Sequence, residues 1–346
     1  MSARLHPGGF ALLASLGWDA QFQEKFRQIA EPREVPARVL ADYGADYLLH
    51  DSEGMRRATA RHVDPAVGDW VAVEDDAIKR IVERRTVFAR QGPGAETRQQ
   101  VLAANVDVAF VVAAATDVNV RRIERYLTIA WQSGAMPVVV LTKADLLEPS
   151  RGLLSELESV AATSPVAVTS SVSGEGLGEI TRHLQPNRTG VLLGPSGAGK
   201  STLINSIVGS AVMRTREIHG ASGEGRHMTS HRQLVQLPEG GMIIDTPGLR
   251  EAQLWEGEDA LAAVFDDIEE LARGCRFNDC AHRSEPGCAI KAALADGSLD
   301  AGRFDSYRKL QRELRAIAAR ADARIRIEER RKWRNIARAA RSRARP

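Results

Sequence analysis

The stretch GPSGAGKS, Gly194–Ser201, fits the pattern G-x-x-x-x-G-K-[ST] of a phosphate-binding loop. It joins the apolar segment TGVLLG to the apolar-periodic segment KSTLINSIVG, which predict a strand and a helix. Backbone N–H groups in such a loop curl around phosphate oxygens, and glycine permits the close approach. Lys200 would neutralise phosphate charge and Ser201 would bind Mg²⁺; the alternative is a plain glycine-rich turn. The residues predicted to contact a nucleotide here are Gly194, Pro195, Ser196, Gly197, Ala198, Gly199, Lys200, Ser201 and Thr202.

Strands and helices alternate before and after this loop. Parallel strands are predicted for the apolar runs VDVAFVVAAAT, MPVVVLT and PVAVTSS, and helices for VRRIERYLTIAWQSG, LLSELESVAAT and LGEITRHLQ. This alternation indicates a doubly wound α/β domain that extends to about residue 265. Open α/β sheets bind ligands beyond the carboxyl ends of their strands, so the loops that follow these strands are the candidate site.

Two segments after the phosphate loop have chemistry suited to the metal and the terminal phosphate. Asp245 ends an apolar strand in GGMIIDTPGLRE, where it can hold Mg²⁺ through water while the N–H of Gly248 meets the γ-phosphate. The polar, glycine-rich residues 216–234 are expected to be too loose for a packed element. They form either a mobile surface loop or a switch in which Thr229 reaches Mg²⁺. Ser201, Thr229 and Asp245 are therefore the predicted magnesium ligands.

Two short segments carry side chains suited to reading guanine. In VVVLTKADLLEP, residues 138–149, Asp145 offers two acceptor oxygens that match the N1–H and N2–H₂ of guanine, and Lys143 can lay its stem over the base. In TSSVSGEGL, residues 169–177, Ser170 and Ser171 can approach the guanine carbonyl. Each tetrapeptide alone is weak evidence, but both follow apolar strands and so favour one base site.

Residues 35–90 have a different sequence pattern, with short apolar segments and frequent turn residues. Five short strands are predicted for VPARVLAD, DYLLHD, MRRATARH, DWVAVED and IKRIVERRTVFAR, which are separated by turn residues. Five strands in so short a segment favour a small barrel, with the OB-fold as the leading candidate. The pattern leaves open whether this barrel is a structural module or binds nucleic acid.

The three cysteines of the 346-residue chain lie within fourteen residues. Cys275, Cys280, His282 and Cys288 have the spacing C-x4-C-x-H-x5-C, which suits a closed, tetrahedral, structural Zn²⁺ site. Three buried free cysteines are the alternative. An odd, clustered count favours a metal site in a reducing compartment over a disulfide framework.

Composition excludes some classes of protein and locates the charge. With 43% hydrophobic and 27% charged residues the chain can bury a core, and no apolar run approaches the ~20 residues of a membrane span. No clean cleavage site follows the apolar residues near the N-terminus, so no signal peptide is expected. The net charge is +2, yet residues 303–346 contain sixteen basic and five acidic side chains, or +11. This run is either a solvated surface or a segment that binds RNA phosphates.

In chain order, TKAD, TSSVSGEGL, GPSGAGKS, GRHMTSHR and DTPG resemble the elements of a circularly permuted GTPase. With the barrel before them and the cysteine cluster after them, the chain resembles the ribosome small-subunit-dependent GTPase A family from about Arg38 to Tyr307. The resemblance implies a multidomain α/β protein. Its expected parts are an N-terminal extension (1–34), an OB-fold β-barrel (35–95), a circularly permuted P-loop GTPase domain (100–265), and a helical zinc-binding domain with a basic tail (266–346).

The resemblance also implies a function. It suggests a cytoplasmic, monomeric GTP hydrolase that binds the 30S ribosomal subunit and 16S rRNA in late subunit maturation, with hydrolysis stimulated by the ribosome. The implied cofactors are one structural Zn²⁺, and Mg²⁺ with GTP. His227 matches the switch histidine of the family, although an exposed loop histidine is the alternative. The predicted catalytic residues are Lys200, His227, Thr229, Asp245 and Gly248.

Three residues depart from common GTPase patterns. Thr142, a predicted GTP-binding residue with Lys143, Asp145, Ser170 and Ser171, stands where most GTPases have Asn, which predicts a weaker tie between the base-reading loop and the phosphate loop. Leu249 replaces a water-orienting Gln, which implies slow hydrolysis without a partner. Met228 replaces the commoner Thr beside Thr229. Two other classes of function stay open: a P-loop enzyme for a small substrate, and an RNA-binding module that holds GTP without hydrolysing it.

Overall fold

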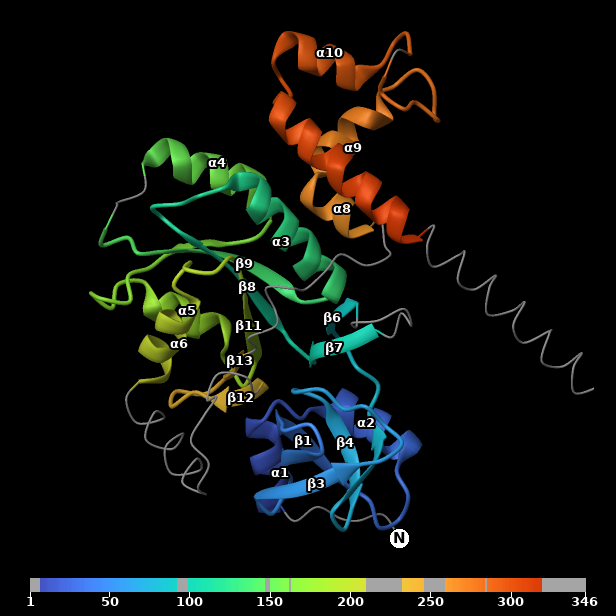
Figure 1. Cartoon of the computed structure of the whole chain (residues 1–346), viewed down its shortest axis with the longest axis vertical. Coiled ribbons are helices and arrows are strands. Elements are labelled where there is room, and N and C mark those ends of the chain that lie inside the picture. The colour runs from blue at the N-terminus through green and yellow to red at the C-terminus, as the bar shows by residue number, and fades with distance from the viewer. Residues whose placement is uncertain are drawn as a thin grey trace, which may run out of the picture. The chain divides into compact units, whose positions relative to one another are not determined.

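The computed structural model describes residues 7–91, 99–146, 150–161, 163–209, 232–245, 259–283 and 285–318. The chain forms two compact units, residues 1–253 and 254–346. Figure 1 labels the helices and strands of each unit. Among the described residues, the helices are all too short or too polar to cross a membrane. The four-part division expected from the sequence is finer than these two units and stays a prediction.

Five strands of the first unit close into a small barrel. Strand β1 pairs with β2, β2 with β3, β3 in parallel with β5, β5 with β4, and β4 again with β1. Val39, Leu49 and Val71 are fully buried at its centre. This is the OB-fold that the turn-separated strands predicted. The strands are β1 (Val35–Asp42), β2 (Asp46–His50), β3 (Met55–Ala60), β4 (Trp70–Glu74) and β5 (Ala77–Ile81).

Two short helices, α1 (Pro7–Ser15) and α2 (Ala20–Ile29), precede the barrel. Asp19 caps α2 by accepting the backbone N–H groups of Gln21 and Phe22. The rings of Trp18 and Trp70 meet edge to face, with their centroids 4.6 Å apart. This aromatic contact packs the helical segment onto strand β4 and buries both indoles.

The last predicted barrel strand, residues 78–90, is two strands in the structure. Strand β5 ends at Ile81, and β6 (Val87–Gln91) pairs instead with β7 (Gln99–Ala104) in a separate antiparallel ribbon. Between them Arg84 donates to both carboxylate oxygens of Asp69, at 2.8 and 2.7 Å. The chain therefore leaves the barrel at a buried ion pair, which a continuous β-pattern does not reveal.

Five parallel strands and one antiparallel strand, β12, form the sheet of the α/β domain. The spatial order is β10-β9-β8-β11-β13-β12, and the first five strands are parallel. Helices α3 and α4 lie on one side of this sheet and α5 and α6 on the other (Figure 1). The strands are β8 (Val108–Ala114), β9 (Met136–Thr142), β10 (Val166–Val168), β11 (Thr189–Leu193), β12 (Arg232–Gln236) and β13 (Met242–Asp245), and the helices are α3 (Val120–Ser133), α4 (Arg151–Ala161), α5 (Leu177–His183) and α6 (Lys200–Val208).

The strand order fits the permuted order of the nucleotide-binding elements. Strand β11, which leads into the phosphate loop, lies between β8 and β13, although β8, β9 and β10 all precede it in the chain. Phe110, Val140 and Leu192 from three of these strands are buried together in one core. The predicted doubly wound domain is therefore confirmed.

Strand β12 corrects the expectation that residues 216–234 are too loose for a packed element. The strand begins at Arg232, inside that segment. It pairs with β13 along one edge and with β1 of the barrel along the other, where Ala41 lies opposite Gln233. Backbone hydrogen bonds to two neighbours stabilise a strand whose own side chains are mostly polar. This pairing joins the barrel and the α/β domain in one eleven-stranded sheet.

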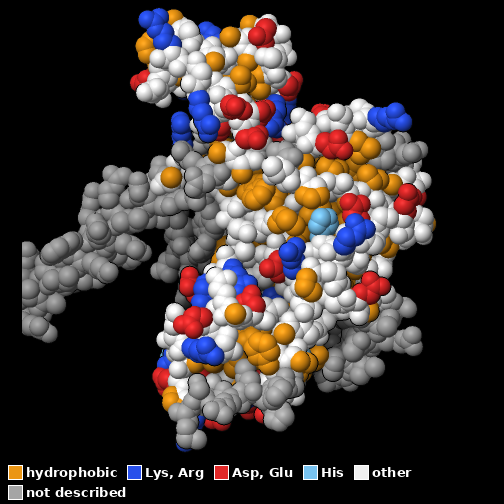
Figure 2. Space-filling model, turned by 180° about the vertical axis from the view of Figure 1, so that it is seen from behind, with side chains coloured by type: hydrophobic (Ala, Val, Ile, Leu, Met, Phe, Trp, Pro, Cys, Tyr) orange, Lys and Arg blue, Asp and Glu red, His pale blue; other side chains and the backbone are white. Residues whose placement is uncertain are grey.

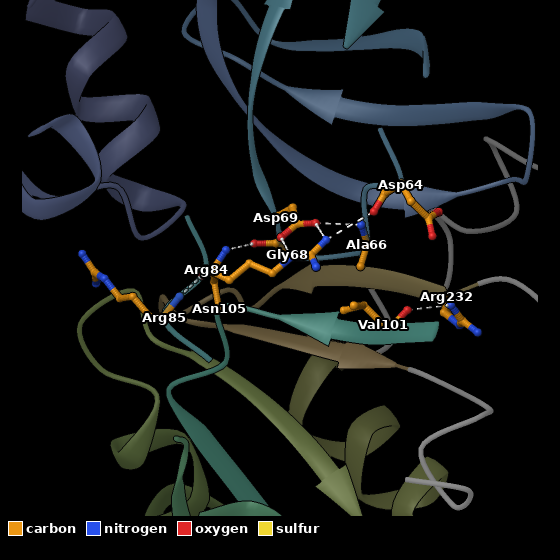
Figure 3. Close-up of polar contacts among 9 residues, drawn as sticks. All are labelled: Asp64, Ala66, Gly68, Asp69, Arg84, Arg85, Val101, Asn105 and Arg232. Atoms are coloured by element: carbon orange, nitrogen blue, oxygen red, sulfur yellow. Dashed lines mark hydrogen bonds and ion pairs between the residues drawn. The ribbon is translucent and has the colours of Figure 1, made fainter. Parts of the chain in front are cut away.

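Side chains reinforce the junction between the barrel and the α/β domain (Figure 3). Asn105 donates to the carbonyl of Gly68 at 3.1 Å and accepts the backbone N–H of Arg85 at 2.9 Å. Arg232 of β12 reaches the carbonyl of Val101 in β7. Gly68 has φ +92°, and a Cβ there would lie 2.2 Å from the carbonyl oxygen of Ala104, so only glycine fits.

The described residues of the second unit form helices and connecting turns without a strand, as the loss of strand patterns predicted. Its helices are α8 (Asp259–Val264), α9 (Asp266–Arg273), α10 (Ala289–Asp296) and residues 301–318. Phe265, Ile268 and Leu314 are among its buried residues. Arg303 binds both oxygens of Asp267 at 2.7 Å each and lies over the ring of Phe265. This bidentate pair fixes the last helical segment against α9.

Candidate nucleotide-binding site and metal centre

The phosphate loop links β11 to α6 at the carboxyl edge of the sheet. Gly194, Gly197 and Gly199 all have positive φ angles, of 150°, 80° and 88°. A Cβ at Gly194 would lie 2.3 Å from the carbonyl oxygen of Val112, so the neighbouring strand β8 also excludes any larger residue there. These conformations turn the loop sharply before the helix and orient its amides, which is the arrangement that phosphate binding requires.

Lys200 and Ser201 stand at the first turn of α6. In this structure the ammonium group of Lys200 donates to the carbonyls of Gly194 and Pro195, at 2.8 and 2.6 Å. The lysine is thus held over the loop at the helix N-terminus, where an anion is favoured. Ser201 and Thr202 are exposed, as are Ser196 and Gly197, whereas Ala198 is buried.

The two predicted base-reading segments lie side by side. The hydroxyl of Ser170 donates to Asp145 at 2.6 Å, and the backbone N–H of Ala144 donates to the carbonyl of Thr169. Ser170 is 1% exposed, while the Asp145 carboxylate is exposed at the strand edge. The structure therefore makes Ser170 a brace for Asp145. Ser171 accepts a hydrogen bond from Ser206 of α6 through its carbonyl, at 3.4 Å.

Thr142 contacts the phosphate loop. Its hydroxyl donates to the carbonyl of Ala198 at 2.6 Å, which ties the end of β9 to the phosphate loop. The tie between the two loops is therefore present with Thr at this position, and its weakness relative to Asn stays a prediction. The next residue, Lys143, has φ +60° and is partly exposed. No local pattern in TKAD reveals the distance to Ala198.

Two of the predicted magnesium ligands, Asp245 and Ser201, are among the described residues. Asp245 ends β13, which β11 separates from β8, and it is partly exposed. Ser201 lies at the start of α6, which follows the adjacent strand β11. Two of the three predicted magnesium ligands therefore follow neighbouring strands, because Asp245 ends β13 and Ser201 lies in the helix that follows β11. His227, Met228, Thr229, Gly248 and Leu249 lie outside the described residues.

The cysteine cluster lies in the second unit, before and at the start of α10. The ligand atoms of Cys275, Cys280, His282 and Cys288 all lie within 4.8 Å of one another. The Sγ atom of Cys275 is 3.9 Å from that of Cys288, and Nδ1 of His282 is 3.6 and 3.5 Å from these two sulfurs. Ligands at the usual Zn–S and Zn–N lengths in a tetrahedron are separated by roughly 3.8 and 3.6 Å. The cluster therefore fits one tetrahedral metal ion.

The surroundings favour thiolate at Cys275. Burial raises the pKa of its thiol, but hydrogen bonds from the backbone N–H groups of Ala289 and Ile290 outweigh this and hold the pKa below its usual value. His282 has φ +56°, and its ring packs against the edge of Phe304. The helix N-terminus and the aromatic ring thus orient two of the four ligands.

Solved structures share this fold. YloQ, described as a circularly permuted GTPase, is 25% identical with a TM-score of 0.58, and the match covers 82% of this chain and 96% of YloQ. YjeQ from Thermotoga maritima is 24% identical with a TM-score of 0.60, over 81% of this chain and 98% of YjeQ. The likeness to YjeQ supports the fold alone, and the likeness to YloQ also supports the permuted order.

Relatives found by sequence have a higher identity to this chain than these structures do. Proteins named small ribosomal subunit biogenesis GTPase RsgA from Opitutus terrae and Streptomyces avermitilis are each 44% identical to this chain and cover 96% of it. The matches span 98% and 95% of those relatives. The family described as RsgA GTPase matches residues 81–255, from the end of the barrel to beyond Asp245. Because the family model matches about half of the chain and relatives of that name are 44% identical over 96% of it, the chain belongs to the RsgA GTPase family.

Proposed function

We propose that this chain hydrolyses GTP while bound to the small ribosomal subunit and acts in the late maturation of that subunit. The observation that carries the proposal is the braced pair Asp145–Ser170 beside the phosphate loop, in a chain 44% identical to relatives named for small-subunit biogenesis. The carboxylate of Asp145 and the phosphate loop lie at the same edge of the sheet, so the first can bind the base of GTP and the second its phosphates.

The phosphate end of the site supplies positive charge and holds the phosphate groups in position. Lys200 would leave the carbonyls of Gly194 and Pro195 and donate to phosphate oxygens, where it stabilises the charge that develops as water attacks the γ-phosphorus. The amides of the glycine-rich turn bind the remaining oxygens. The predicted roles of Gly248 and His227 at the attacking water belong to the same proposal.

Two metals belong to the proposal. Ser201, Asp245 and Thr229 would hold Mg²⁺, which shields the negative charge of the β- and γ-phosphates. Cys275, Cys280, His282 and Cys288 would hold Zn²⁺ in a closed site. Four protein ligands leave no open position, so the zinc would stabilise the helical unit and take no part in hydrolysis.

The base end of the site sets specificity. Asp145 would accept hydrogen bonds from the N1–H and N2–H₂ of guanine, a pattern that adenine lacks. The hydroxyl of Ser170 fixes the rotamer of that carboxylate before the nucleotide arrives. Lys143 would cover the base plane with its aliphatic stem.

RNA binding would use two regions. On the barrel, the guanidinium of Arg57 lies over the ring of Tyr43, 5.5 Å from its centroid, and Tyr43 is 40% exposed. Arg57 is in β3 and Tyr43 is in the β1–β2 loop, and OB-folds bind nucleic acid on the β2–β3 face and through this loop. Figure 2 shows basic and acidic side chains interspersed on one face of the described chain. The concentrated positive charge is in residues 303–346, which we propose contact 16S rRNA phosphates.

The test is GTP turnover with and without purified 30S subunits. Addition of subunits should raise turnover, and 50S subunits at the same concentration serve as the control. The Lys200→Ala variant should bind the subunit and lose turnover in both conditions. Unchanged turnover on addition of 30S subunits would contradict the ribosome-dependent function. Turnover that is already high without RNA would favour an enzyme for a small substrate.

Location and oligomeric state follow from the same proposal. A protein that acts on the ribosomal subunit works in the cytoplasm, and we propose that it does so as a monomer. Sedimentation of the purified protein, alone and with 30S subunits, checks both the monomeric state and the complex.

A further inference from the structure

A cavity of about 290 Å³ lies between the barrel and the α/β domain. Gly17 and Phe22 from the N-terminal helices, Arg38 of β1 and Met136 of β9 line it, with Arg85–Thr86, Asn105–Asp107 and Gly134. Strands β8 and β9 begin at Val108 and Met136, so this cavity is at the amino edge of the sheet. The phosphate loop and the base-reading segments follow the carboxyl ends of the strands. The cavity is therefore separate from the nucleotide site.

Arg38 brings an unpaired charge to this cavity. Its side chain is 2% exposed, and burial lowers its pKa to about 10, so it stays protonated near neutral pH. Its terminal nitrogens donate to the carbonyls of Leu16 and Asn105, to the hydroxyl of Thr189 and to the sulfur of Met242. All four acceptors are neutral. No carboxylate of the described residues forms an ion pair with Arg38, and a buried unpaired charge is costly.

Two guanidinium N–H groups have no acceptor in the part of the chain that the structure describes. They are the Nε–H of Arg38 and the Nε–H of Arg85, and both nitrogens are buried. Besides burial, the carboxylates of Asp107 and Asp69 act on Arg38 through space and raise its pKa, whereas the guanidinium of Arg85 lowers it by repulsion. Two neighbouring cations with one unused donor each are suited to an anion.

The other polar groups of the lining already have partners. Thr86 exchanges hydrogen bonds with the backbone of Val106, Asn105 binds Gly68 and Arg85, and Asp107 accepts the backbone N–H of Thr189 at 2.7 Å. Arg85 also donates to Asp19 outside the cavity. The charged residues of the lining are Arg38, Arg85 and Asp107, whose formal charges sum to +1, and Arg85 also forms an ion pair with Asp19.

The remaining walls are apolar. Phe22, Val106 and Met136 line the cavity, and the guanidinium of Arg85 stacks on the ring of Phe22, 3.7 Å from its centroid. The volume is at the lower end of the range for small-molecule pockets. A carboxylate has two oxygens for the two unused N–H groups, and a short hydrocarbon body would match the walls.

We propose that this cavity binds a small monocarboxylate with an apolar body, held by the guanidinium groups of Arg38 and Arg85. Such a ligand contacts the barrel through Arg38 and the α/β domain through Val106 and Met136. It would therefore bridge the two halves of the first unit, at a site that does not overlap GTP.

Benzoate is the probe, and benzyl alcohol is its neutral counterpart of similar shape. Binding to the full chain is measured by calorimetry and by the rise in melting temperature, at constant ionic strength with chloride as the balancing anion. Benzoate should bind saturably at millimolar concentrations and benzyl alcohol at least about tenfold more weakly, because it lacks the charge. Saturating GTP should leave the benzoate affinity unchanged.

The variant Arg85→Met keeps the length of the side chain and its packing on Phe22 but removes the donor. It should weaken benzoate binding by about tenfold or more. Arg27→Met is the matched control, since Arg27 is an exposed arginine of α2 with a carboxylate neighbour, Glu24, and does not line the cavity. The proposal is overturned if benzoate does not bind, if benzyl alcohol binds as tightly, if GTP displaces benzoate, or if Arg85→Met binds it like the control.

Discussion

The hydroxyl of Thr142 donates a 2.6 Å hydrogen bond to the carbonyl oxygen of Ala198 and so connects the base-reading loop to the phosphate loop. Thr142 is 2% exposed, and a Cβ at Gly199 would lie 3.1 Å from its oxygen. The two loops are in contact through a side chain with little freedom. Nucleotide affinity should therefore depend on a residue that need not touch the nucleotide.

Replacement of Thr142 by Val removes the hydroxyl while it keeps the shape of the side chain. The carbonyl of Ala198 then loses a buried donor, which costs on the order of 1–3 kcal/mol. We expect GTP and GDP to bind about tenfold more weakly, as measured by fluorescent-nucleotide titration. Thr142→Ser, which retains the hydroxyl, should stay within about threefold of the wild type. Equal losses in both variants would show that the hydrogen bond does not matter.

Replacement of Asp145 by Asn should shift the nucleotide preference from GTP toward XTP. The amide presents a donor where the carboxylate presented an acceptor, and xanthine carries a carbonyl where guanine carries N2–H₂. Competition between the two nucleotides for one fluorescent analogue measures the shift. If the variant keeps full selectivity for GTP, Asp145 does not read the base.

Removal of the Ser170 hydroxyl tests the brace on that carboxylate. Ser170→Ala deletes the 2.6 Å bond to Asp145 and the acceptor for the backbone N–H groups of Val172 and Ser173. A hydrogen bond to a charged group contributes about 1.5–3 kcal/mol, so GTP affinity should fall by about tenfold or more. Ser173→Ala is the control, because its hydroxyl does not contact Asp145 among the interactions described. Similar affinities for the two variants would contradict the brace.

Metal removal should unfold the helical unit and expose its thiols. All three cysteines of the chain are in the cluster, so a thiol reagent reports on this site alone. We expect one zinc ion per chain by elemental analysis, and three reactive thiols only after chelation. Cys288→Ser should lose zinc and the helical signal of the second unit. A chain that is fully folded without metal would overturn the structural role.

Truncation of the basic tail should weaken subunit binding and reduce its dependence on salt. The cut belongs after Ala318, since a cut after Leu310 would also remove Leu314, which is 3% exposed and packed in the helical unit. Residues 319–346 contain eleven basic and three acidic side chains, a net charge of +8. For every RNA phosphate that the shortened chain no longer neutralises, the slope of log affinity against log salt should fall by about 0.7–0.9. An unaltered slope would mean that the charge does not touch RNA.

The sequence by itself determined the elements whose cause is local. The phosphate loop depends on glycines spaced within eight residues, the strands and helices on periodicity over about fifteen or fewer residues, and the cysteine cluster on spacing within fourteen residues. Their order along the chain was enough to indicate the permuted GTPase, because each element is recognisable before any packing is known.

Only the tertiary structure decided which distant residues meet. The pairing of Ala41 with Gln233 turns a polar segment into strand β12, the ion pair of Arg84 with Asp69 ends the barrel, and the bond from Thr142 to Ala198 connects the two nucleotide loops. These contacts join residues up to nearly two hundred positions apart. Backbone pairing, burial and hydrogen bonds stabilise these contacts, and they form only in the packed chain. A local sequence pattern therefore cannot predict which residues meet.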